Sequence, residues 1–298
     1  MSAHTKLFEL VKNNAVRRLV LANGVDNSSL EAVSKAVNLG LVSVCITGDE
    51  TKIADGCSTH GLLPGDYAVY HADNAELAVL KAVELVHSGK ADLIMKGLVN
   101  TDTFMRAILD KHNGLLPKGA LLSHVSMIVN PQYHKPLFVS DVAIIPLPTL
   151  EQKAIMLSYL IKVAQSFGIE RPKVAFIAAS EKVIEKMTAC TDAALLKEMW
   201  VNGDFPSSVC EGPMAFDLAV DKEAAAIKNY TSPVAGEADC LLFPNIETGN
   251  VFYKLNTRWC KAEAAAIVMG TEVPVVLSSR GDTMQTKLNS IAFAAITA

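Results

Sequence analysis

The chain has 298 residues, of which 50% are hydrophobic and 19% are charged, and its net charge at pH 7 is −4. This composition excludes a disordered chain and predicts a well-packed protein with room for two domains. The lysines and arginines are scattered, so we expect no nucleic-acid partner. No apolar run reaches the about 20 residues of a membrane span, and the N-terminus lacks a signal-peptide core. We therefore expect a soluble, cytoplasmic protein without a membrane partner.

The first half of the chain alternates apolar runs with amphipathic segments. Either Asn27 or Ser28 can cap the first helix of this series, and Thr101 or Asp102 can cap the last. Strands that alternate with helices through short loops predict βαβ units and a parallel sheet covered on both faces. The expected strands are 17–24 with its closing turn, 41–49, 67–72 and 91–97, and the expected helices are 28–40, 74–89 and 101–109.

A change of composition follows at IPLPTLEQKA (145–154), where two prolines precede a long helix that begins about Thr149. A second α/β series comes after it, and one more strand–helix pair begins at VPVVLSS (273–279). This late pair could complete the second sheet or return to the first, and the pattern alone leaves both arrangements open. The expected elements of the second series are strands near 172–180, 207–213, 237–244 and 262–270 and a helix at 191–200.

The six cysteines and seven histidines are dispersed, without a CxxC or HxxxH spacing. We therefore expect neither a disulfide framework nor a metal site. No GxGxxG or Walker A pattern follows any expected strand, which argues against a dinucleotide or triphosphate loop.

Ligands of doubly wound sheets bind beyond the carboxyl ends of the strands, so polar residues at those ends are the candidates for a site. Asp141 and Asn250 follow expected strands, and Thr101 and Arg106 lie in the helix after the strand ADLIMKG. Each has a simpler explanation as well. Helix capping would account for Thr101, and Arg106 fits a solvated helix face.

The stretch VVLSSRGDT (275–283) carries the strongest local signal. Ser279 and Arg280 stand where an apolar strand meets a helix N-terminus, a place that favours anions, and an arginine fork binds phosphate or carboxylate. The alternative is an arginine that pairs with Asp282.

Five stretches, taken in chain order, resemble the phosphate acetyl/butyryltransferase family over nearly the whole chain. The forms MKGLVNT and CTDAALLKEM are more similar to butyryltransferases than to acetyltransferases. The five stretches are RRLVLANGVDNSSLEAVSKAVNLGLVSVCITGDETKI, ADLIMKGLVNTDTFMRAIL, SDVAIIPLPTLEQKA, SPVAGEADCLLFPNIETGNVFYKL and VPVVLSSRGDT.

The resemblance implies an α/β fold of two three-layer domains with mostly parallel sheets. The architecture would be like that of isocitrate and isopropylmalate dehydrogenases, with the site in the interdomain cleft. The expected first domain is 1–140 plus 273–298, to which the late strand–helix pair returns, and the second is 141–272. The resemblance also implies a homodimer or higher homo-oligomer with no metal or cofactor, because coenzyme A is a substrate.

The implied activity moves a short-chain acyl group, preferably butyryl, between coenzyme A and inorganic phosphate. Arg280 would clamp the phosphoryl oxygens and Ser279 would donate to the oxyanion. Arg106 matches the arginine of the family's TADTLRPAL-type helix, and if it faces the cleft we expect it to hold a substrate phosphate. Thr101, Asp141 and Asn250 are expected to bind substrate.

One position departs from the acetyltransferase pattern, because Thr286 stands where those members carry a catalytic aspartate. Asp282 is the nearest carboxylate, and it could be the proton acceptor or only a helix cap. Three other functions remain open: a phosphate acetyltransferase, a decarboxylating dehydrogenase, and a non-catalytic protein that binds acyl-CoA or another metabolite. A dehydrogenase should show several metal-binding aspartates near one helix, whereas the sequence has one DxxxD pair, Asp217 and Asp221, and no such cluster.

Overall fold

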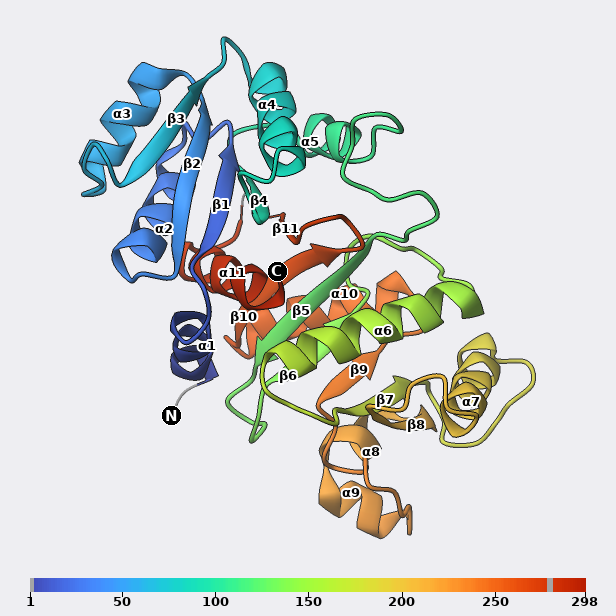
Figure 1. Ribbon diagram of the computed structural model, residues 1–298. Helices are drawn as coiled ribbons and strands as arrows, with labels where there is room; N and C mark the ends of the chain where they lie inside the picture. Colours follow the sequence, from blue (N-terminus) through green and yellow to red (C-terminus); the bar gives the residue numbers. More distant parts are fainter. Residues whose placement is uncertain (1–2, 278–280) are drawn as a thin grey trace. The chain divides into compact units, whose positions relative to one another are not determined.

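The computed structural model describes residues 3–277 and 281–298. The chain forms two compact units: the first comprises residues 1–122 and 265–298, and the second comprises residues 123–264. Both are built from strands and helices that alternate along the chain (Figure 1). The expectation of a mixed α/β protein is confirmed, whereas the domain division at 140 and 272 stays a prediction.

The first unit contains a mostly parallel sheet in the order β3-β2-β1-β4-β11-β10. Only the β10–β11 pair within it is antiparallel. β11 lies beside β4, with Val276 opposite Met95, so the late strand–helix pair returns to the first sheet. The strands are β1 Arg17–Ala22, β2 Val42–Gly48, β3 Tyr67–His71, β4 Leu93–Lys96, β10 Glu263–Met269 and β11 Val275–Val276.

Helices cover this sheet on both faces, as the connections require. The chain moves from β1 to β2 and β3 through α2 and α3 and then crosses back to β4 through α4, so right-handed crossovers place α4 on the opposite face from α2 and α3. α11 packs against α2 and α1 (Figure 1). The helices are α1 Ala3–Lys12, α2 Asn27–Asn38, α3 Glu50–Thr59, α4 Ala75–His87, α5 Thr101–Ile108 and α11 Met284–Thr297.

The second unit has the strand order β5-β6-β9-β7-β8, in which only β5 and β6 are antiparallel. Its strands are β5 Ser123–Val129, β6 Leu137–Ser140, β7 Lys173–Ile177, β8 Val209–Met214 and β9 Cys240–Leu242. Its helices are α6 Leu150–Ser166, α7 Thr188–Val201, α8 Phe216–Val220, α9 Lys222–Ile227 and α10 Ile246–Lys254, which continues as a π-helical turn, Leu255–Trp259.

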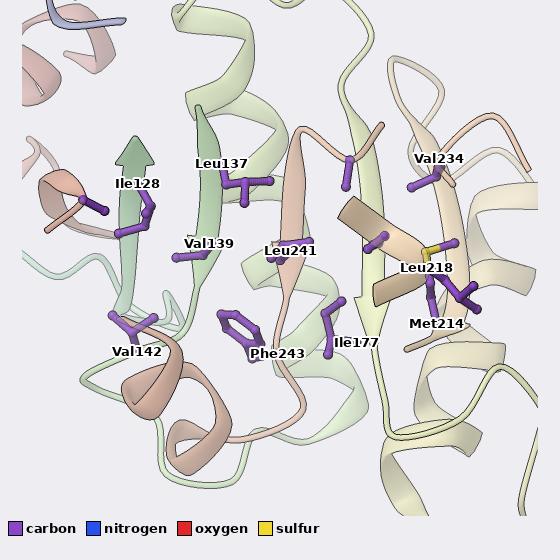
Figure 2. Close-up of a cluster of buried hydrophobic side chains, with 14 of the residues drawn as sticks. Ile128, Leu137, Val139, Val142, Ile177, Met214, Leu218, Val234, Leu241 and Phe243 are labelled. Carbon is purple, nitrogen blue, oxygen red and sulfur yellow. The ribbon is translucent and has the colours of Figure 1, made fainter. Parts of the chain in front are cut away.

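The core of the second unit follows the two-residue period of its strands. Val139 of β6 and Leu241 of β9 belong to the buried cluster that also contains Leu218 of α8 (Figure 2). Their neighbour in β6, Phe138, belongs to the opposite face, where its ring meets that of Phe167 after α6 at 5.5 Å between centroids. Helices therefore cover both faces of this sheet, which is built in three layers.

The helix starts show where local sequence signals hold and where they fail. Thr149 caps α6 through a capping box with Gln152, as its sequence predicts. The prediction for α2 is wrong, because its N-cap is Asp26 rather than Asn27 or Ser28. The Asp26 carboxylate accepts a hydrogen bond from the Ser29 N–H at 2.9 Å, and this frees the serine hydroxyls for other partners.

The cysteines are all free thiols, and Cys260 is the exposed one. Across residues 3–277 and 281–298, no group of three or more His, Cys, Asp or Glu side chains is placed to hold a metal ion. No helix in this part of the chain combines the length and the apolar character needed to cross a membrane.

Candidate active site

The carboxyl ends of β1 and β4 lie side by side in the first unit, where Ala22 is paired with Lys96. From β1 the chain proceeds to β2 on one side, whereas β4 has β11 on its other side. Connections that leave in opposite directions open a crevice at the strand ends, which is where doubly wound sheets bind their ligands. This position is the candidate site.

Two loops meet closely at this crevice. The Gly97 N–H donates to Ala22 O and the Leu98 N–H donates to Asn23 O, each at 2.9 Å. A Cβ atom at Gly97 would lie 2.5 Å from Asn23 O, so only glycine allows the loop after β4 to approach the loop after β1. This close approach explains the glycine of the motif MKG.

A cavity of about 350 Å³ opens between these loops and the starts of α2, α4, α5 and α11. Its walls combine serine hydroxyls, one carboxylate and two lysines, which come from β4 and α11. The lining residues are Asp26, Ser28, Ser29, Ala75, Lys96, Gly97, Leu98, Val99, Asn100 and Lys287.

Lys287 of α11 is the most informative of these residues, because its side chain is only 6% exposed. Its ammonium donates to Ser28 Oγ at 2.8 Å and approaches Ser29 Oγ at 3.4 Å. In the described part of the chain these neutral hydroxyls are its partners, and no carboxylate pairs with it. A buried cation without a counterion is unfavourable, so the cavity is suited to an anion.

Lys96 adds a second ammonium to the same cavity. It is 7% exposed, and its Nζ donates to Gly97 O at 3.2 Å and to Val99 O at 3.1 Å. Asp26 supplies one negative charge. One carboxylate oxygen caps α2, and the other is buried and has no hydrogen-bond partner among residues 3–277 and 281–298. Two ammonium groups and one carboxylate leave the cavity with a net positive charge.

The structure places only some of the site residues predicted from the sequence near this cavity. Ser279 and Arg280 lie outside the described residues. Thr101 begins α5 directly after the cavity residue Asn100, and Arg106 is exposed on the second turn of that helix. Neither Thr101 nor Asp102 is the cap of α5, because Asn100 holds the N-cap position.

The start of α11 decides one of the two roles considered for Asp282. Thr283 is the N-cap, and its Oγ1 accepts a hydrogen bond from the Thr286 N–H at 3.1 Å. Asp282 precedes the cap, so the expectation that it caps this helix is wrong. Its role as a proton acceptor stays a prediction.

Asp141 and Asn250 belong to the second unit, where both hold backbone. Each carboxylate oxygen of the buried Asp141 accepts two hydrogen bonds, and all four are between 2.7 and 3.0 Å. Asn250 Nδ2 donates to Val142 O at 2.9 Å and so ties α10 to the loop after β6. The structure thus brings these two predicted residues together around one loop.

The two cavity lysines are not among the residues predicted from the sequence. Lys96 could have been noticed, because it stands inside the apolar run ADLIMKG, where a charged residue is unusual. Lys287 gave no comparable signal. Its partner Ser28 is 259 residues away, and a lysine within a helix ordinarily indicates a solvated face.

An α/β unit with a positively charged cavity at the switch point of its sheet belongs to the class of proteins that bind anionic ligands there. The family model "Phosphate acetyl/butaryl transferase" matches residues 71–295. The chain is 42% identical to phosphate butyryltransferase of Clostridium acetobutylicum over 97% of its own length and 95% of that protein. It is 35% identical to phosphate acetyltransferase of Rhizobium meliloti, with coverages of 99% and 93%.

A similar solved structure is also that of a phosphate acyltransferase. The branched-chain phosphotransacylase of Enterococcus faecalis matches with a TM-score of 0.82 and 29% identity, over 95% of this chain and 99% of that one. The chain belongs to the phosphate acetyl/butyryl transferase family.

Proposed function

We propose that this protein is a phosphate acyltransferase that moves a short-chain acyl group between coenzyme A and inorganic phosphate. The observation that carries the proposal is the buried Lys287 ammonium in a cavity with a net positive charge, in a chain that belongs to this family. Butyryl is the favoured acyl group because the relative with 42% identity is named a butyryltransferase. Acetyl is the second candidate, since an acetyltransferase is 35% identical.

The reaction needs an enzyme that brings two negatively charged substrates together. A phosphate oxygen attacks the thioester carbonyl carbon of acyl-CoA and forms a tetrahedral oxyanion. The C–S bond then breaks, so that acyl phosphate forms and coenzyme A leaves as a thiolate that takes up a proton. Positive groups at the phosphate reduce charge repulsion and fix the direction of attack.

We assign the reacting groups to the segment between β11 and α11. Arg280 is proposed to clamp the phosphate with its planar fork, and Ser279 to donate to the oxyanion. In support, the two elements that flank this segment belong to the first unit, and α11 supplies Lys287 to the cavity. Asp282 is proposed to exchange the thiol proton of coenzyme A.

Four further residues are proposed to act around the substrates. We assign Arg106 to a substrate phosphate and Thr101 to the substrate near the cavity, because α5 begins next to Asn100. The four hydrogen bonds to Asp141 argue that it acts by holding its loop. Asn250 of α10 donates to the same loop.

We also propose the architecture that the resemblance implies: two domains like those of isocitrate and isopropylmalate dehydrogenases, with the substrates in the cleft between them. The enzyme is proposed to be a cytoplasmic homodimer or higher homo-oligomer that needs no metal or cofactor. Light scattering coupled to size-exclusion chromatography measures the subunit number, and a purely monomeric protein would contradict that part.

The test of the activity is release of free thiol from butyryl-CoA with and without phosphate. Phosphate-dependent release, together with acyl phosphate trapped as a hydroxamate, is the expected result, and butyryl-CoA should be used faster than acetyl-CoA. Release without phosphate would indicate a thioesterase. Binding of acyl-CoA without release would favour the non-catalytic alternative, and reduction of NAD or NADP with a hydroxy acid would favour the dehydrogenase.

A further inference from the structure

We infer that Lys287 and Ser28 form the receptor for a phosphoryl dianion of a substrate. The inference rests on the proposed function for the identity of the ligand. The two side chains form a hydrogen bond although their residues are 259 positions apart in the sequence. Lys287 is assigned as the residue that recognises the phosphoryl charge inside the cavity.

The hydrogen bonds of the ammonium leave room for a ligand. An ammonium has three N–H donors, and among residues 3–277 and 281–298 its partners are the hydroxyls of Ser28 at 2.8 Å and Ser29 at 3.4 Å. One donor therefore has no acceptor in the described protein. Ser28 is exposed whereas Ser29 is 2% exposed, so the Ser28 hydroxyl is the one that a ligand can reach.

The charges around the cavity favour an oxyanion. Lys96 is held by the carbonyls of Gly97 and Val99 and so contributes its charge from a fixed position. With the Asp26 carboxylate in the same wall, the described side chains that line the cavity carry one net positive charge, which attracts a phosphoryl group. Serine hydroxyls add donors of the kind that phosphate oxygens accept.

A purely structural role for Lys287 is the alternative. Its neighbours Leu288 and Ile291 on α11 are buried, and Lys287 could simply tie α11 to α2 through the two serines. A tie of this kind touches no substrate, so its replacement by methionine would affect stability and leave every KM unchanged. The two roles therefore differ in the kinetics of Lys287→Met rather than in its folding.

Two substrates carry a phosphoryl dianion, inorganic phosphate and the 3′-phosphate of coenzyme A. The variants for the test are Lys287→Met, Lys287→Arg and Ser28→Ala. Lys228→Met is the matched control, because Lys228 is an exposed lysine of the second unit that pairs with Asp217. KM is measured for phosphate, for butyryl-CoA and for butyryl-dephospho-CoA, which lacks the 3′-phosphate.

Loss of one charge-assisted hydrogen bond predicts a rise of at least about 10-fold in one KM for Lys287→Met. A rise for phosphate assigns the receptor to inorganic phosphate. A rise for butyryl-CoA but not for butyryl-dephospho-CoA assigns it to the 3′-phosphate, and either result supports the inference. Lys287→Arg should recover part of the loss, Ser28→Ala should show a smaller shift in the same constant, and Lys228→Met should match the wild type.

The inference is overturned if all three constants stay within about twofold of the wild type in both Lys287→Met and Ser28→Ala. If Lys287→Met fails to fold, the same criterion applies to Ser28→Ala and Lys287→Arg. If the wild type releases no thiol, the proposed function fails, and calorimetric titration with inorganic phosphate and with coenzyme A replaces the kinetics. Binding that weakens in Lys287→Met would then still support the receptor, and unchanged or undetectable binding would reject it.

Discussion

Replacing Asp141 with alanine should unfold the second unit more easily, because this carboxylate accepts hydrogen bonds from two buried and two partly buried donors. Both of its oxygens are used, and the side chain belongs to a residue that is 2% exposed. The four donors are the Ser123 hydroxyl and the N–H groups of His124, Ala143 and Ile144. Each buried donor left without a partner costs about 1–3 kcal/mol. The two buried donors alone, Ser123 Oγ and the His124 N–H, predict at the low end a loss of about 2 kcal/mol for Asp141→Ala.

Urea unfolding followed by far-UV circular dichroism measures this loss. Asp141→Asn should also destabilise the protein, because the side-chain NH2 group of asparagine cannot accept the hydrogen bonds that one carboxylate oxygen accepts in the wild type. Asp217→Ala is the control, because that carboxylate forms an exposed ion pair in the same unit and should cost at most about 1 kcal/mol. A loss below about 1 kcal/mol for Asp141→Ala, with activity abolished, would refute the structural role and return Asp141 to the substrate-binding residues.

Three further predictions concern separate parts of the chain. Lys153→Met should lower the free energy of unfolding by about 3 kcal/mol in urea titrations, because it leaves the carboxylate of Asp192 without its buried partner at 2.6 Å; an unchanged midpoint would contradict this. The hydrogen bond from Lys222, assisted by two other basic side chains, lowers the pKa of Glu237 from 4.5 to about 2. Its charged form therefore stabilises the fold above about pH 4.5, and this contribution is lost as the pH falls toward 2. Acid unfolding of Glu237→Gln should show a smaller loss across that range, and a profile parallel to that of the wild type would rule the effect out. Arg280→Ala should lower kcat/KM at least about 100-fold in the thiol-release assay, with partial recovery in Arg280→Lys, whereas wild-type phosphate kinetics would remove Arg280 from the site.

The sequence was sufficient for the elements whose signals are local. The alternation of apolar runs with amphipathic segments predicts the parallel strands, and the capping box at Thr149 predicts the start of α6. At α2 three consecutive residues could all serve as the cap, and the choice of Asp26 depends on where the chain leaves β1. Local propensity does not contain that information.

The cavity itself could be predicted only in part. Ligands of doubly wound sheets bind beyond the carboxyl ends of the strands, so the loops after β1 and β4 are expected to line a ligand site. The charge of the site depends on Lys287, whose burial arises because α11 packs against α2. That packing joins segments far apart in the chain, so no pattern within either segment reveals it.

The return of the chain to its first sheet has a consequence for how the protein is made. β11 covers the open side of β4, and α11 covers α2, but both are translated only after the whole second unit. On the ribosome β4 is therefore an uncovered edge strand with the apolar sequence LIMK, and such edges pair readily with other chains. A nascent chain that stalls after the second unit would carry an incomplete first sheet that is prone to aggregation. It would also lack Lys287, whose ammonium gives the cavity its net positive charge.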